Sequence, residues 1–238
     1  MNMSISVKRI QAIFMKDYKE FSRNYAISIM VFIPIVFAFL YSTDGEGAAS
    51  MYSFLLNLSL AMLTSFVQAC LIAEEKERNT LRSLMMTPAS MLDILLGKSA
   101  LVFVISAVIL AISTFIYGYE PANLFLLLLG VGISIILYIA LGTICGLYSK
   151  SVMEASLTVF PVVIIFTAGP FAILFADKFP ILEAFLYLPS SQLNELIAFM
   201  SDGAPMGDML MAIGIIAIWT VVLTIVSFIL YKKRLMDQ

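Results

Sequence analysis

The sequence contains six apolar runs, and their length constrains the fold more than any other feature. A membrane-spanning helix needs about 20 mostly apolar residues, and only the first run is a little shorter than that. The runs are continuous and lack the alternation of apolar and polar residues that marks the strands of a membrane β-barrel, so they predict helices. The predicted spans are residues 26–41, 51–73, 99–117, 123–148, 156–176 and 209–231.

The composition supports the same conclusion. Hydrophobic residues make up 61% of the chain and charged residues 13%, with a mean hydropathy of +1.01. A chain of 238 residues cannot hide that much apolar surface in its own interior. We therefore predict an all-α integral membrane protein with six transmembrane helices, which forms a single transmembrane domain over residues 1–238.

The basic residues indicate the orientation. Six spans place both termini on one side, and every Lys and Arg except Lys178 falls on that side. The positive-inside rule makes this side cytoplasmic. The segments on the opposite side are mostly acidic, so the net charge of −2 averages two differently charged faces. The sequence predicts a multi-pass protein of the cell membrane with both termini in the cytoplasm.

Residues 1–24 are predicted to form an amphipathic helix in the membrane interface. Val7, Ile10, Phe14 and Phe21 share one face of such a helix, with basic residues largely elsewhere. A basic amphipathic helix of this kind lies along a membrane surface. A solvated tail with scattered apolar residues is the alternative.

The segment 177–208 is too apolar for a free loop. Pro180 and Pro189 divide it, and Ser191 is positioned to cap a helix that follows. We predict two short helices that form a re-entrant hairpin in the outer leaflet, buried against protein. A small extracellular domain is the alternative.

The usual residues of catalytic and metal sites are scarce. The chain has no histidine, which removes the commonest general base and metal ligand. Cys70 and Cys145 are interpreted as small packing residues. Gly97-Lys98-Ser99 resembles the end of a phosphate-binding loop, but Leu92 stands where that motif needs glycine. We interpret Lys98 as an anchor at the membrane edge, and we expect no catalytic residue, metal, cofactor or nucleic-acid partner for this chain.

The second predicted span carries a stripe of uncharged polar residues. Ser53, Asn57, Thr64 and Gln68 fall on one side of a regular helix, joined through Ala61. This stripe is a candidate for the lining of a translocation path. Hydrogen bonding between packed helices explains it equally well, and both interpretations stay open.

The most unusual stretch is the charged segment 73–90, AEEKERNTLRSLMMTPAS, between two apolar runs. Glu74 and Arg78 are spaced for an i,i+4 pair, so the second span is predicted to continue as helix. Further on, Leu81, Leu84, Met85 and Pro88 have the spacing of one apolar helix face. An apolar face outside the bilayer needs a partner, either the lipid headgroups or a groove on a second protein.

This stretch resembles the "E-x-E-x-x-T/G-x-x-x-L-x-x-x-P" signature of ABC type-2 exporter permeases. It reads Glu-Glu-Lys-Glu-Arg-Asn-Thr-Leu over residues 74–81, followed by Leu84-Met85 and Thr87-Pro88, with Thr80 where the family often has glycine. The sequence Leu-Tyr-Leu-Pro-Ser-Ser at residues 186–191 is similar to a second family element. The resemblance covers the whole chain, including the order of spans and loops.

The resemblance implies a non-catalytic permease that pairs as a homodimer or heterodimer and works with a separate ATPase subunit, which binds ATP and magnesium. In the family, a coupling helix in the loop after the second span, here residues 74–98, enters a groove on the ATPase. By resemblance the coupling residues are Glu74, Glu75, Glu77, Arg78, Leu81, Leu84, Met85 and Pro88.

The cargo expected from the resemblance is hydrophobic or amphipathic, such as a peptide or a drug-like molecule. The same family also exports sodium, lipids or polysaccharides, so these are alternatives. A secondary carrier and a membrane scaffold without transport activity are the competing classes. Dependence of transport on ATP distinguishes them from an ABC exporter.

Overall fold

The computed structural model describes residues 6–42, 48–78 and 90–236. In this part of the chain every regular element is helical. The elements are α-helices, three short 3₁₀ segments (η1, η3 and η4) and one π-helical turn (η2). In chain order they are α1 (Val7–Arg23), α2 (Tyr25–Ser28), η1 (Ile29–Val31), α3 (Phe32–Leu40), α4 (Ala48–Ser59), η2 (Leu60–Ser65), α5 (Phe66–Glu77), α7 (Met91–Tyr117), α8 (Leu124–Tyr148), α9 (Val152–Ala172), η3 (Ile173–Phe175), η4 (Pro180–Tyr187), α10 (Pro189–Asp202) and α11 (Met206–Met236).

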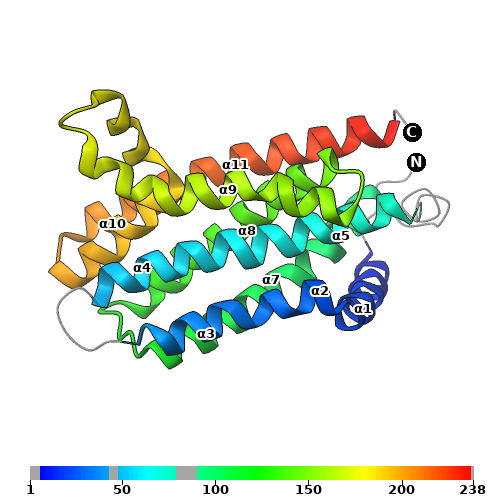
Figure 1. Ribbon diagram of the computed structural model, residues 1–238, viewed down its shortest axis with the longest axis horizontal. Helices are drawn as coiled ribbons and strands as arrows, with labels where there is room; N and C mark the ends of the chain where they lie inside the picture. The colour runs from blue at the N-terminus through cyan, green and yellow to red at the C-terminus, as the bar shows by residue number, and fades with distance from the viewer. Residues whose placement is uncertain (1–5, 43–47, 79–89, 237–238) are drawn as a thin grey trace.

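The long helices run side by side along the long axis of the molecule (Figure 1). Five helical stretches of the described residues are long and apolar enough to cross a membrane, and they correspond to five of the predicted spans. The first predicted span is shorter, an apolar helix over Ile29–Leu40. Its 3₁₀ turn precedes Pro34, whose ring removes one helical hydrogen bond. The all-α membrane fold is confirmed, and the number of six crossings stays a prediction.

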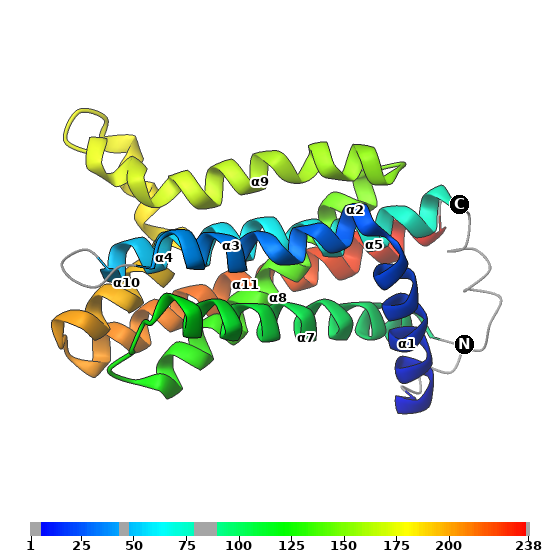
Figure 2. The same cartoon turned by 60° about the horizontal axis from the view of Figure 1, so that its bottom comes forward.

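Helix α1 crosses the end of the bundle at a steep angle to the long helices (Figure 2), the same end at which α11 finishes. The predicted helix is confirmed over Val7–Arg23, and its place in the membrane interface stays a prediction. Val7 is 77% exposed, and the buried face carries Ile13, Asp17 and Phe21. The reason is that α1 packs against α7, and this contact selects the face around Ile13.

The stretch formed by α4, η2 and α5 is the most buried of the five long helices. Helix α8 packs closely against it because α8 presents two glycines. A Cβ atom on Gly142 would lie 2.5 Å from the carbonyl oxygen of Ser65, and one on Gly146 would lie 2.6 Å from that of Ala69. The G-x-x-x-G pair therefore permits backbone contact between helices of this chain.

The two short helices predicted before the last span are present as η4 and α10. Helix α10 packs against α4, α8 and α11, and Leu193 and Leu196 are fully buried there. The predicted cap is wrong: α10 begins at Pro189, with Leu188 as the capping residue, and Ser191 lies inside the first turn. Proline starts a helix readily because its backbone angle is already helical.

Candidate functional site

A cluster of buried charged side chains joins α1, α5 and α7 at the end of the bundle where α1 lies. Lys98 of α7 is only 1% exposed. Its Nζ atom lies 3.0 Å from Oδ2 of Asp17 on α1 and 2.9 Å from Oε1 of Glu75 on α5. Because a buried ammonium group is tolerated only when it is paired, these ion pairs attach the three helices to one another.

Lys16 completes this buried charge cluster from the solvent side. Its Nζ atom lies 3.3 Å from Oε1 of Glu75, 3.4 Å from Oδ1 of Asp17 and 3.3 Å from Oε2 of Glu20. Partial burial lowers the pKa of the Lys16 ammonium group, but the carboxylates of Glu75, Asp17 and Glu20 outweigh this effect and raise the pKa above its usual value. Lys16 therefore stays charged at neutral pH, and the buried carboxylates face two ammonium groups.

The interpretation of Lys98 as an anchor at the membrane edge is thus wrong. Such an anchor extends its ammonium group to the lipid headgroups, whereas α1 covers Lys98. The neighbouring Gly97 makes this possible, because a Cβ atom there would lie 2.8 Å from Cγ2 of Ile13. Because Gly97 has no side chain, α1 can approach closely, and Lys98 forms an ion pair with Asp17 of that helix.

Asp93 provides a second connection between α1 and α7. Its buried carboxylate accepts hydrogen bonds from Nε of Arg9 at 2.7 Å and from the backbone N–H groups of Ser6 and Ser90, both at 2.9 Å. Ser90 accepts a hydrogen bond from the N–H of Asp93 in return, which forms a capping box at the start of α7. Helix α1 is therefore bound to the chain directly after residues 79–89.

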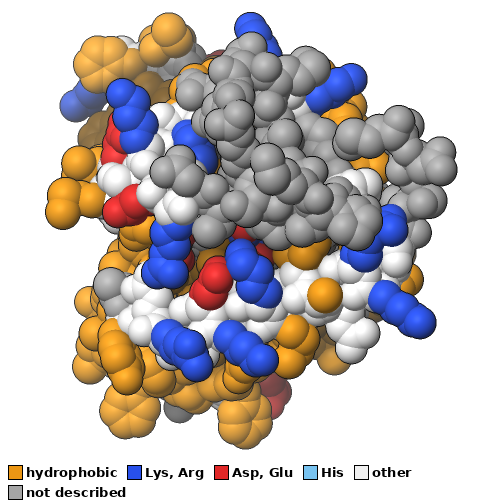
Figure 3. Space-filling model, turned by 90° about the vertical axis from the view of Figure 1, so that its right-hand side faces the viewer, with side chains coloured by type: hydrophobic (Ala, Val, Ile, Leu, Met, Phe, Trp, Pro, Cys, Tyr) orange, Lys and Arg blue, Asp and Glu red, His pale blue; other side chains and the backbone are white. Residues whose placement is uncertain are grey.

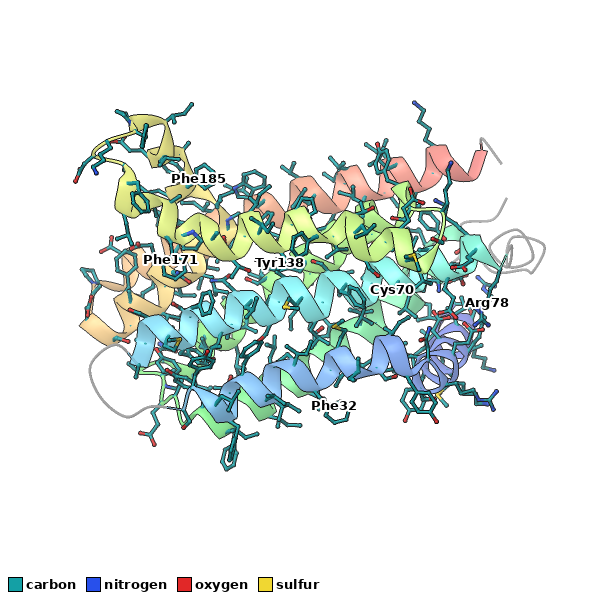
Figure 4. All side chains as sticks on the ribbon, viewed as in Figure 1. Phe32, Cys70, Arg78, Tyr138, Phe171 and Phe185 are labelled. Carbon is teal, nitrogen blue, oxygen red and sulfur yellow. The ribbon has the colours of Figure 1, made fainter. Side chains whose placement is uncertain are left out.

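Four predicted coupling residues lie on the last turn of α5 and directly after it. Oε1 of Glu74 lies 2.7 Å from Nη2 of Arg78, which confirms the i,i+4 pair. Glu75 belongs to the buried charge cluster, while Glu77 and Arg78 are exposed. Figure 4 shows Arg78 beside α1. The remaining four lie outside the described residues, and their role in coupling stays a prediction: Leu81, Leu84, Met85 and Pro88.

The end of α5 is also attached to the connection between α8 and α9. Nζ of Lys76 donates a hydrogen bond to the carbonyl oxygen of Leu147 at 2.7 Å and another to that of Ser149. Oε2 of Glu77 accepts one from the backbone N–H of Val152 at 2.9 Å. Residues 79–89 are thus flanked by two helix ends, each tied by charged groups to other elements. Lys and Arg side chains surround this end of the molecule (Figure 3).

The polar residues of the second predicted span are all buried. Nδ2 of Asn57 donates to Oδ1 of Asn194 on α10 at 2.6 Å. Oγ1 of Thr64 donates to Oγ of Ser106 on α7 at 2.9 Å. Hydrogen bonds from these side chains therefore connect the span to neighbouring helices.

Gln68 and Ser53 complete the stripe. Nε2 of Gln68 donates a hydrogen bond to Oγ1 of Thr143 on α8 at 2.9 Å. Oγ of Ser53 donates a hydrogen bond to the carbonyl oxygen of Ser50 in its own helix. The stripe is hydrogen-bonded to three different helices, α10, α7 and α8. The π-helical turn η2 lies between its two halves and rotates the second half relative to the first. These contacts are the interhelical hydrogen bonds of the alternative interpretation, and a path along the stripe stays a prediction.

Sequence reasoning missed the partners of Lys98. The available signal was Asp17, a charged residue four positions after Ile13 and four before Phe21 on the face that α1 buries. A carboxylate on an apolar helix face requires a cation opposite. The sequence does not reveal which cation pairs with Asp17, because Asp17 and Lys98 are 81 positions apart.

One protein family, described as ABC-2 family transporter protein, has a sequence model that matches residues 2–229. No curated protein is detectably similar in sequence.

Proposed function

Because this chain belongs to the ABC-2 transporter family, as a membrane permease component of an ABC transporter, we propose that it exports its cargo with energy from a separate ATPase subunit. ATP and magnesium bind to that subunit. Two permeases pair side by side in the membrane, either as identical copies or as this chain with a related one.

The observation that carries this proposal is the buried charge cluster beside residues 79–89. The predicted coupling helix lies in that segment, between α5 and α7. Lys98, Glu75 and Asp17 connect both helices to α1. When the ATPase subunits close on ATP, the segment moves with the groove that holds it, and the ion pairs transmit this motion to three helices at once.

The cargo that suits the membrane part is hydrophobic or amphipathic, with a peptide or a drug-like molecule as the first choice. The polar stripe of α4 to α5 is uncharged, whereas carriers driven by ions usually need carboxylates within the membrane. Export of sodium, lipids or polysaccharides is the second candidate within the family.

The test replaces Leu84 by Asp. Leu84 lies outside the bilayer by its place in the sequence, so the permease is expected to fold and insert. A charge in an apolar groove leaves a desolvated group, and truncating an interface anchor commonly costs about 2 kcal/mol or more, which is roughly 30-fold in affinity. The variant is expected to lose its ATPase during purification, or to retain it without cargo-stimulated hydrolysis.

The matched control is Ser201→Asp, which adds the same charge to an exposed position at the opposite end. It is expected to leave assembly and hydrolysis unchanged. Assembly and stimulated hydrolysis at the unmodified level in Leu84→Asp would remove the coupling role. Cargo transport that continues without ATP would favour a secondary carrier instead.

A further inference from the structure

An open groove of about 560 Å³ lies between α7 and α8 at the end of the molecule opposite α1. Figure 2 shows these two helices side by side. Leu110, Leu127 and Ile135 are buried and form its base, while Phe115 and Leu128 are exposed at its rim. The volume falls in the range of small-molecule sites, and both helices are long enough to cross a membrane. The groove therefore opens toward lipid.

Small residues keep this groove open. Ala107 and Ala111 line it from α7, and Gly132 lines it from α8. A Cβ atom on Gly132 would meet no other atom within 4 Å. This glycine differs from Gly142 on the same helix, which is needed for helix contact. The space beside Gly132 is thus not used for packing within the chain.

The outer end of the groove is polar and acidic. The rings of Tyr52 and Tyr119 are stacked there with centroids 4.1 Å apart, and Oη of Tyr52 is hydrogen-bonded to Oγ1 of Thr114 at 2.9 Å. Glu120 follows Tyr119 and also lines the groove. Glu120 is exposed and has no hydrogen bond or ion pair with any residue that the structure describes. The groove therefore combines an apolar body with one carboxylate and aromatic faces.

We propose that this groove binds an amphipathic amine, with its hydrocarbon chain between α7 and α8 and its ammonium group beside Glu120 and Tyr119. The apolar body accommodates the chain through the hydrophobic effect. A carboxylate and a tyrosine ring both attract an ammonium group, by charge-assisted hydrogen bonding and by cation–π contact. The proposal goes beyond the proposed function, because it holds whether or not the amine is cargo and requires no ATPase.

Charge complementarity distinguishes this ligand from a bilayer lipid with an ethanolamine headgroup. Such a lipid carries a phosphate close to its ammonium group. None of the described residues that line the groove is Lys or Arg, so a phosphate there would lie near Glu120 without a compensating cation. An amine without a phosphate avoids this repulsion.

Photolabelling of the full-length permease in phosphatidylcholine nanodiscs tests the proposal. The probe is dodecylamine with a diazirine near the end of its chain, and the neutral comparison is dodecanol with the same diazirine. Labelled peptides are identified by mass spectrometry. The amine is expected to label α7 and α8 along the groove, above the level of the alcohol.

Two variants test separately the binding of the ammonium group and the binding of the hydrocarbon chain. Glu120→Gln is expected to reduce amine labelling of the groove by about tenfold or more and to leave alcohol labelling unchanged. Gly132→Leu fills the groove and is expected to reduce both. The matched control is Glu183→Gln, which removes an exposed carboxylate of η4 that does not line the groove, and it is expected to have no effect.

Three results would overturn the proposal. The first is amine labelling spread evenly over the lipid-facing helices. The second is unchanged groove labelling in Glu120→Gln. The third is displacement of the amine by phosphatidylethanolamine added to the nanodiscs, which would assign the groove to a lipid. Thermal unfolding of each variant checks that the fold is kept, and none of these results bears on whether the permease couples to an ATPase.

Discussion

Single residues decide how the helices at the α1 end of this permease are joined, and Lys98 is the clearest case. It lies within 3.0 Å of two carboxylates from two other helices. A buried pair that loses one partner leaves an uncompensated charge, which commonly costs about 3–5 kcal/mol. If one of the two carboxylates is neutralised as well, less uncompensated charge remains and the loss of stability is smaller.

We therefore expect Lys98→Met to lower the thermal unfolding temperature of the purified permease strongly. The double variant Lys98→Met, Glu75→Gln leaves Asp17 with Lys16 as its counter-charge, so it is expected to recover part of the loss. Unfolding curves in detergent measure both. A double variant that is at least as unstable as the single one would show that the charges are not coupled.

At the scale of helices, two glycines of α8 have opposite surroundings. A Cβ atom on Gly142 would lie 2.5 Å from a backbone carbonyl oxygen, which cannot move aside, whereas one on Gly132 meets nothing. Close packing of α8 on α5 thus depends on Gly142 and Gly146 and not on glycine in general.

Gly142→Ala is expected to destabilise the bundle by about 1–3 kcal/mol, the usual cost of overpacking. Gly132→Ala on the same helix serves as the control and is expected to be neutral or slightly stabilising, because alanine favours helix more than glycine does. The two variants are compared by the fraction of protein that remains folded after heating to a series of increasing temperatures. Equal behaviour of the two variants would contradict the close approach at Gly142.

At the scale of the whole molecule, the orientation of the bundle in the membrane is a testable prediction. Lys and Arg side chains gather at the end with α1 (Figure 3), and the positive-inside rule predicts that this end is cytoplasmic. Ser90 is buried and caps α7, so it is unsuitable for labelling. Lys150 and Ser201 are exposed at the two opposite ends.

Single cysteines at these positions test the topology in a background where Cys70 and Cys145 are replaced by Ala. A membrane-impermeant thiol reagent applied to intact cells is expected to label Ser201→Cys and not Lys150→Cys. Labelling of Lys150→Cys only after the membrane is opened completes the test. The reverse pattern would invert the orientation, and labelling of both from outside would refute six crossings.

The amino-acid sequence by itself determined the fold class, the approximate spans and the Glu74–Arg78 pair, because these depend on the composition and spacing of residues close together in the chain. The long helices, α1 and the two short helices before α11 were all predictable in this way. Tertiary structure alone decided that Lys98 is buried, that Val7 is exposed and that the polar stripe bonds three different helices. Each of these depends on which helix lies opposite, as in the contact between Asp17 and Lys98 across 81 positions, and local periodicity carries no information about such partners.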